Sequence, residues 1–343
     1  MNITIASDTD EQVWDDVVIN SSEGTLFHTW KWLKIMEKHN RTKIFSRTYK
    51  GKLYPLIVWK GKEIIGLMPI FFYDTPLIKM AISPPSSVET NYLGPVMKKK
   101  NGLTSYKRQI IFHEFQKKID DFFKNTLRSD YIKIKSAPGM FDPRHFIWSN
   151  YEVQPEYTYI IDLTLGEKRI WGNFSNTLRN SINRANKSGF TVTTGVKEDM
   201  EIIYNQLHQR QRVHASNEFI LEILKNFSPE NVKVFITYKD DIPLTGVLLV
   251  CYKNKVWVWV GTPKNSIDGI NPNNILYWEC IRWACTNNYQ SFEVIGASDI
   301  STYPYKVKLC GEIAPFYSMK WYSPLNRLIV SLDRGLHPRY KES

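Results

Sequence analysis

The pattern of apolar and polar positions predicts two halves that repeat the same order of elements. In the first half we expect a helix at 26–39, two strands within 54–73 around the turn Lys60-Gly61-Lys62, a strand near 92–96, a helix at 105–127 and a strand at 131–135. The helix at 105–127 has an apolar side, and residues 131–135 alternate as a half-buried strand does. A loop of small residues follows at 136–139.

The second half is expected to follow the same plan. Its expected elements are a helix that opens at the capping box Thr164–Glu167 and runs through 177–190, a strand at 190–194, two helices within 197–227 with a break near His214–Asn217, strands from Val234 to Val250 and over 255–261, a helix from Pro272 to about Thr286 and a strand at 291–296. Gly66 and Gly246 occupy matching points of the two hairpins, and the offset is roughly 160–180 residues. The pattern therefore predicts a duplicated α/β unit.

Composition and charge bound the class of protein. The chain has 343 residues, of which 43% are hydrophobic, so it is long enough for two folded domains and is not a disordered chain. The net charge of +11 favours an anionic partner such as nucleic acid, a phosphorylated cofactor or an anionic membrane surface. The run Lys98-Lys99-Lys100 precedes Asn-Gly and is most simply a solvated turn.

Cysteine spacing and hydropathy exclude other classes. The four cysteines form no C-x-x-C pair, so no zinc site or other metal is expected. No run of 18 apolar residues is present, and the acidic N-terminus does not resemble a signal peptide. We therefore expect a cytoplasmic, monomeric protein with reduced thiols and no tightly bound cofactor, and peripheral contact with a membrane remains open.

The expected helix at 177–190 has two faces. An apolar stripe includes Ile170, Phe174, Leu178, Ile182 and Ala185, and it is interpreted as core. From Lys168 to Phe190 there are five Lys or Arg and no Asp or Glu. Such a face can bind phosphate oxygens, or it can be a solvated face in a chain that is rich in asparagine.

Four segments resemble the FemABX-type aminoacyltransferases. The segment from Tyr159 through L-R-N-S-I-N-R-A-N-K-S-G-F is similar to a strand ending in Asp-Leu followed by R-x-x-I-x-x-A-x-x-x-G, with Arg179, Ile182, Ala185 and Gly189 in register. The segment F-E-V-I-G…Y-K-V-K-L-C-G-E resembles the family pattern at Glu293, Gly296, Tyr305, Lys306, Leu309 and Gly311, and Cys310 replaces the first glycine of a pair. F-H-T-W-K-W near the N-terminus and Pro272 complete the resemblance.

The resemblance spans about residues 25–325 and implies an α/β fold with mixed sheets, built as tandem GNAT-like domains of the acyl-CoA N-acyltransferase type. The implied domains are residues 1–155 and 156–325, with a tail at 326–343 that returns to the N-terminal domain or is disordered. The distance from Val196 to Val232 is too short for the coiled-coil arm of some Fem proteins.

The implied reaction is transfer of an aminoacyl group from aminoacyl-tRNA to an amine of a cell-wall precursor or similar acceptor, with an anionic small molecule or lipid-linked precursor as partner. No Ser-His-Asp or Cys-His arrangement is visible, and aminolysis of an activated ester does not require one. Two alternatives stay open: an acyltransferase that uses an acyl thioester such as acyl-CoA, and a non-catalytic RNA- or ligand-binding protein. The R/Q-x-x-G-x-G/A loop that binds the CoA pyrophosphate is absent from both halves, which counts against acetyl-CoA.

The resemblance also names candidate site residues. Lys306 is the candidate catalytic residue, with an electrostatic role at the developing oxyanion or at a phosphate. The candidates for substrate binding are Arg212, with Arg210 as the alternative, Arg179, Lys34 and Tyr305. The candidates for tRNA or phosphate binding are Arg184 and Lys187, which come from the basic face of the expected helix at 177–190 and not from the resemblance.

Overall fold

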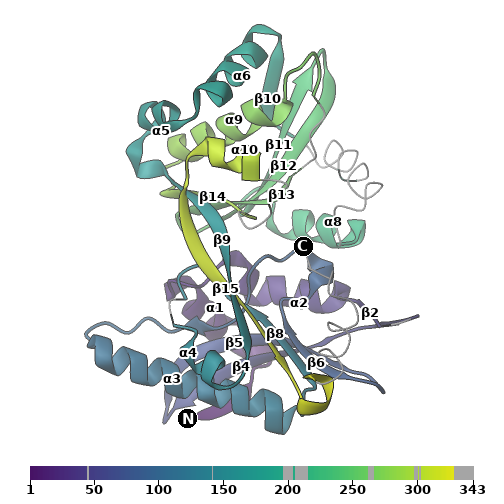
Figure 1. Ribbon diagram of the computed structural model, residues 1–343, viewed down its shortest axis with the longest axis vertical. Coiled ribbons are helices and arrows are strands. Elements are labelled where there is room, and N and C mark those ends of the chain that lie inside the picture. The colour runs from purple at the N-terminus through teal and green to yellow at the C-terminus, as the bar shows by residue number, and fades with distance from the viewer. Residues whose placement is uncertain are drawn as a thin grey trace. The chain divides into compact units, whose positions relative to one another are not determined.

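The computed structural model describes residues 1–44, 46–140, 142–195, 204, 215–261, 266–296, 300 and 303–327. It divides into two compact units (Figure 1). Unit 1 comprises Met1–Glu156 and the chain from Pro315 onward, and unit 2 comprises Tyr157–Ala314. The sequence analysis placed the second boundary at 325, whereas in the structure the chain enters unit 1 again at Pro315. Beyond Arg327, the expected C-terminal tail lies outside the described residues.

Unit 1 contains strands in the order β1-β4-β5-β6-β8-β15. Their bounds are β1 Asn2–Ile5, β4 Lys52–Lys60, β5 Glu63–Asp74, β6 Lys79–Ser83, β8 Tyr131–Lys135 and β15 Glu312–Tyr322. β6 and β8 are parallel, and the other neighbours within this unit are antiparallel. The short strand β7 (Val96–Met97) pairs with β5 at Gly66 and Leu67. A Cβ on Gly66 would lie 2.7 Å from the carbonyl oxygen of Val96, so the approach of β7 requires glycine there.

Helices cover both faces of the unit 1 sheet (Figure 1). They are α1 Glu11–Asn20, α2 Trp30–His39, α3 Ser105–Asp121 and α4 Arg144–Trp148, and a separate hairpin consists of β2 Thr42–Ile44 and β3 Arg47–Tyr49. Phe112, Phe115 and Ile119 of α3 pack with Met68 and Ile70 of β5 in one buried cluster. α1 and α2 contact the strands β5 and β4.

Unit 2 repeats the topology of unit 1, with strands in the order β10-β11-β12-β13-β14-β9. Their bounds are β9 Glu152–Asp162, β10 Phe190–Thr194, β11 Val232–Lys239, β12 Ile242–Tyr252, β13 Lys255–Gly261 and β14 Ser291–Val294. β13 and β14 are the parallel pair, and the remaining neighbours are antiparallel. In each unit the last strand of this order is out of sequence. β15 of unit 1 follows the strands of unit 2 in the chain, and β9 of unit 2 precedes the other strands of its unit. The predicted duplication is therefore confirmed.

The helices of unit 2 explain its apolar pattern. They are α5 Glu167–Asn173, α6 Asn176–Lys187, α8 Asn217–Phe227, α9 Pro272–Thr286 and α10 Tyr303–Lys306. The stripe predicted as core is buried, since Ile170, Phe174, Leu178, Ile182 and Ala185 are at most 2% exposed. α9 contacts β10, β11 and β12, and α6 packs on α9.

Several local predictions need correction. The helix expected to begin at the capping box of Thr164 is two helices. The first, α5, starts only after Gly166, which has φ +76°, and the extended backbone of Phe174 separates α5 from α6. The hydroxyl of Ser175 accepts from the amide of Leu178 and starts the second helix. The segment at 26–39 begins as a 3-10 turn, Leu26–His28, and the strand near 92–96 is only β7. Of the two helices expected in 197–227, α8 is described, and most of the first lies outside the described residues.

Candidate active site

The parallel strands β13 and β14 of unit 2 stop pairing at their carboxyl ends. β13 and β14 pair from Lys255 opposite Ser291 to Val258 opposite Val294. β14 ends there, whereas β13 continues to Gly261. Open α/β sheets bind ligands at the carboxyl ends of their strands, so this edge is where a site is expected.

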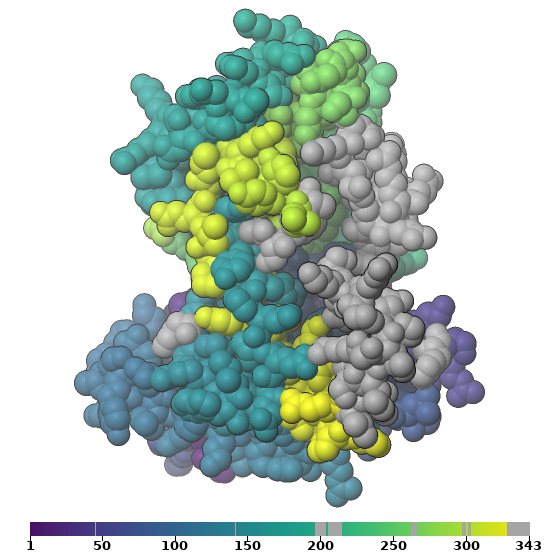
Figure 2. Space-filling model, in the orientation of Figure 1, coloured from purple at the N-terminus to yellow at the C-terminus, as the bar shows by residue number. Residues whose placement is uncertain are grey.

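Lys306 reaches this edge from α10, which lies on the surface of unit 2 (Figure 2). Its half-buried ammonium donates to the carbonyl oxygens of Ile295 and Gly296, the two residues that follow β14. Gly296 has φ +88°, and a Cβ on it would lie 2.7 Å from Lys306 Nζ. Glycine is therefore needed here for the backbone conformation and for room beside the ammonium.

Tyr305 anchors α10 to the start of α9. Its hydroxyl donates to the carbonyl oxygen of Asn273 at 3.1 Å, and its ring meets that of Tyr277 edge-on, with centroids 5.7 Å apart. Burial raises the pKa of Tyr305 well above its usual value, so the hydroxyl stays protonated and remains a donor. The contact places Tyr305 as a support for the lysine beside it.

α6 is fastened to the same region by two contacts. The amide of Ser175 donates to the carbonyl oxygen of Lys308 at 3.2 Å, just after Lys306 in the chain. The amide side chain of Asn274, at the start of α9, donates to Ser181 Oγ at 2.7 Å. α6 and the start of α9 therefore surround the segment that bears Lys306.

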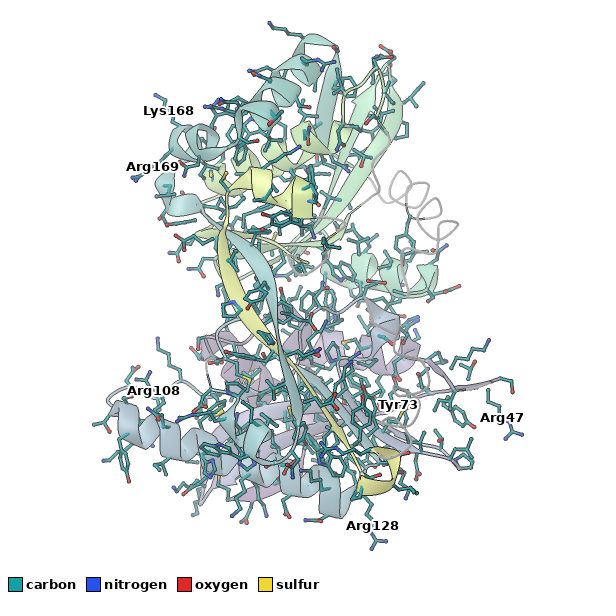
Figure 3. The ribbon with its side chains drawn as sticks, in the orientation of Figure 1. Arg47, Tyr73, Arg108, Arg128, Lys168 and Arg169 are labelled. Atoms are coloured by element: carbon teal, nitrogen blue, oxygen red, sulfur yellow. The ribbon has the colours of Figure 1, made fainter. Side chains whose placement is uncertain are left out.

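The surface of α5 and α6 is basic. Lys168, Arg169, Arg184 and Lys187 are exposed, and Arg179 is half-buried with its guanidinium donating to Asn176 Oδ1. Figure 3 labels Lys168 and Arg169, whose side chains extend away from α5. Among the described residues, none of these five side chains pairs with a carboxylate. We call these five residues the α5–α6 basic surface.

The other predicted site residues lie elsewhere. Arg210 and Arg212 are outside the described residues. Lys34 belongs to α2 of unit 1, where its ammonium lies 3.3 Å from Asp8 Oδ1 and 3.6 Å from Glu37 Oε2, and 5.9 Å from the ring centroid of Trp30. The structure thus brings Lys306, Tyr305 and α6 together within unit 2 and places Lys34 in unit 1.

Some supporting residues were missed from sequence. Asn273, which holds the Tyr305 hydroxyl, follows the proline that was noted at the head of α9, so its neighbourhood was marked but its role was not. Cys310, at the position where the motif has glycine, adopts the left-handed conformation that glycine favours, with φ +51°. The turn after Lys306 therefore keeps a left-handed residue despite the substitution.

Neither a metal cluster nor a membrane span is found where the structure is described. Within those residues no three His, Cys, Asp or Glu side chains gather in a way that could hold a metal ion. No described helix is both long enough and apolar enough to cross a bilayer.

Comparisons with known proteins agree with this geometry. Residues 172–307 match the family described as "Acetyltransferase (GNAT) domain". The fold is similar to that of FemX, with a TM-score of 0.68 and 12% identity, covering 96% of this chain and 100% of FemX. Residues 172–307 form a GNAT-type domain, and the chain as a whole has a double-GNAT fold. No curated protein sequence matches it significantly.

Two further structures are similar in fold to this chain. One is the C-terminal domain of a putative lysylphosphatidylglycerol synthetase from Agrobacterium fabrum, with a TM-score of 0.51 and 12% identity, covering 94% of this chain and 95% of that one. The other is a tandem GNAT protein from the clavulanic acid biosynthesis pathway, with a TM-score of 0.50 and 8% identity, covering 94% and 98%. The predicted fold, family resemblance and enzyme class are confirmed.

Proposed function

We propose that this acyltransferase moves an aminoacyl group from aminoacyl-tRNA to an amine of a cell-wall precursor or a similar acceptor. The observation that carries the proposal is the position of Lys306, held by two carbonyl oxygens at the carboxyl end of β14. The motif around Lys306 is the one that resembles the FemABX-type aminoacyltransferases, and the fold is that of FemX. The name of a second structural relative, a lysylphosphatidylglycerol synthetase, also refers to an aminoacylated product.

In this reaction an amine attacks the ester carbonyl, and the carbonyl oxygen becomes an oxyanion before the tRNA hydroxyl leaves. Lys306 stabilises that oxyanion electrostatically, and the carbonyl oxygens of Ile295 and Gly296 orient its ammonium. Tyr305 is a positioning residue that fixes α10 on α9. The ester is already activated, so alignment of the two substrates supplies much of the remaining acceleration.

The α5–α6 basic surface is proposed to bind the phosphates of the tRNA. Arg184 and Lys187 are its exposed cations on α6, and α6 is fixed beside the segment of Lys306. Arg179 remains a candidate for substrate binding near the start of the same helix, as do Arg210, Arg212 and Lys34 for an acceptor phosphate. Phosphate contacts of this kind position a nucleic acid without reading its sequence.

A transfer assay tests the proposal directly. Total tRNA charged with labelled amino acids is incubated with the protein and an extract of cell-wall and small-molecule precursors. We expect label in a product only when the protein is present, and its loss after the charged tRNA is digested with RNase. Active charged tRNA and extract that yield no product would reject aminoacyl-tRNA as the donor.

A salt titration tests the RNA surface separately. The log–log slope of affinity against salt should fall by about 0.7–0.9 for each phosphate contact that is removed. Arg184→Gln with Lys187→Gln should flatten the slope accordingly. Lys117→Gln with Arg128→Gln changes the same charge on exposed residues of unit 1 and serves as the control. Identical slopes for the two double variants would exclude α6 from the RNA interface.

An acyl thioester is the second candidate donor, because the matching family is described as an acetyltransferase domain. The same assay with labelled acyl-CoA in place of charged tRNA separates the two. Label transferred from acyl-CoA, and not from charged tRNA, would make the thioester the donor.

A further inference from the structure

Unit 1 contains a pocket of its own beside the start of β5 and the short strand β7. The pocket has a volume of about 810 Å³ and is lined by the end of α1, the start of β5, the segment from β7 to α3, the first turns of α3 and the loop that follows β8. Ligand pockets are commonly about 300–1,000 Å³.

The interior of the unit 1 pocket is apolar. Side chains from four different segments contribute to it: Ile65, Met97, Leu103, Phe112 and Met140. These residues are buried or half-buried. An interior of this composition favours the hydrocarbon part of a ligand, because burial of apolar surface is the main source of its affinity.

The rim of the unit 1 pocket is cationic. Four basic residues and two carboxylates line the pocket, which leaves an excess of two positive charges. Lys100 donates to Glu63 at 2.7 Å, and Glu23 accepts from the hydroxyl of Ser21 at 2.6 Å. Within the described part of the chain, Lys98, Lys99 and Arg108 form no salt bridge with a carboxylate, and all three are exposed. We call these three residues the rim cations; Figure 3 labels Arg108 near the start of α3.

The backbone beneath part of the rim is held in place by hydrogen bonds. The amide of Lys98 donates to the carbonyl oxygen of Ile65 at 2.9 Å, and Met97 pairs with Gly66 in the β5–β7 ladder. The ion pair of Lys100 with Glu63 ties the next residues to the start of β5. A fixed rim loses less conformational entropy on binding than a flexible one does.

We propose that the unit 1 pocket binds an amphiphilic anion, with an alkyl or acyl chain in the apolar interior and a phosphate group at the rim cations. Three exposed cations suit a phosphate, which offers several charged oxygens. Loop residues 136–140 after β8 supply no lysine or arginine, so the cations of the pocket come from the segment between β7 and α3 and from α3 itself. The proposal concerns unit 1 alone and does not depend on the donor used in unit 2.

Calorimetry on the full chain with inorganic, hexyl, octyl and decyl phosphate tests both halves of the proposal. Affinity should rise by about fourfold for each additional methylene that is buried. Inorganic phosphate should bind far more weakly than decyl phosphate. Equal affinities along the series, or no binding of decyl phosphate, would overturn the proposal.

Matched variants separate the rim from the interior. Lys98→Gln, Lys99→Gln and Arg108→Gln together should weaken binding of decyl phosphate by at least about tenfold. Lys43→Gln, Lys117→Gln and Arg128→Gln make the same charge change on exposed residues outside the pocket and should leave affinity within twofold. Leu103→Asp should remove the dependence on chain length, whereas Ile110→Asp, at an exposed neighbouring position of α3, should not. Equal effects of the rim and control variants would contradict a role for the rim cations.

Vesicles distinguish the source of the amphiphile. Co-sedimentation is measured with phosphatidylcholine vesicles that contain or lack phosphatidic acid, for the parent chain and the triple rim variant. Binding that requires both phosphatidic acid and the rim cations would identify a membrane lipid. Binding of soluble decyl phosphate without such vesicle binding would identify a free amphiphile.

Discussion

The two units have the same strand topology but differ in the segments that connect their strands. In unit 2, α10 follows β14 closely enough for Lys306 to reach the last carbonyls beyond that strand. In unit 1, apolar residues and exposed cations beside the start of β5 surround a pocket. The two units therefore have similar strands and different connecting segments. The side chains of these segments differ between the units, as is usual when sites are built on loops.

The units also differ in their buried titratable groups. All four cysteines belong to unit 2, and three of them, Cys251, Cys280 and Cys285, are buried or half-buried. Burial raises the pKa of Cys251 to about 11, and that of Tyr289, its hydrogen-bond partner, to about 12. Unit 2 is therefore the part of the molecule in which alkaline pH should reduce stability through buried thiols.

The largest expected effect is that of Lys306→Ala. Loss of one group that stabilises an oxyanion should lower kcat for transfer by about 100- to 1,000-fold with little change in KM. Binding of decyl phosphate to unit 1 should be unchanged, which separates the two sites. Lys308→Ala, two residues on, is the matched control and should retain most of the activity. Steady-state kinetics that show less than a threefold change for Lys306→Ala would remove its catalytic role.

Alkaline pH should produce the next largest effect. An unfolded thiol ionises near pH 8.5, whereas the Cys251 thiol in the folded chain keeps its proton to about pH 11. Between these values only the unfolded chain loses the proton. The stabilising contribution present below pH 8.5 is therefore lost as the pH rises, and the free energy of unfolding falls by about 1.4 kcal/mol per pH unit. Urea unfolding from pH 7.5 to 10.5 should show a shallower decline for Cys251→Ala than for the parent chain. Cys310→Ala, which removes an exposed thiol, is the control, and parallel declines for all three proteins would refute the assignment.

Gly296→Ala should affect activity more than stability. A Cβ there would lie 2.7 Å from Lys306 Nζ and would displace the ammonium, so we expect kcat to fall about tenfold. Gly189→Ala is the matched control, because Gly189 also has positive φ (+76°) but a Cβ on it meets nothing within 4 Å. Both variants should lose about 1 kcal/mol of stability from backbone strain. If Gly189→Ala lowers kcat as much, the displacement of Lys306 is not the cause.

Cys310→Gly should give the smallest effect. Cys310 has φ +51°, where a side chain costs up to about 1 kcal/mol relative to glycine. The substitution restores the glycine of the family pattern and should raise the free energy of unfolding by about 0.5 kcal/mol, because the added freedom of the unfolded chain offsets part of the gain. Chemical denaturation measures the change, and a loss of stability would mean that the thiol itself contributes to the turn.

The sequence by itself determined the elements whose apolar period is unbroken. The buried stripe of Leu178, Ile182 and Ala185 follows from a repeat of 3.6 residues. The strands of both hairpins follow from apolar runs on either side of a turn, and α9 follows from its proline start. The order of these elements was enough to predict the duplication. The motif around Lys306 marked that lysine as a candidate, but the reason for Gly296 beside it was not visible in one dimension.

Only the tertiary structure decided how distant segments meet. The apolar stripe continues across the break between α5 and α6, so periodicity could not show that Phe174 is extended there. The run at 98–100 was predicted to be a solvated turn, yet it forms the rim of a pocket. The reason is that β7 pairs with β5, which places the run beside residues of α3 and of the loop after β8. Local patterns record which face of an element is apolar. Which faces enclose a pocket depends on contacts between residues far apart in the chain, and a pattern along the chain does not contain them.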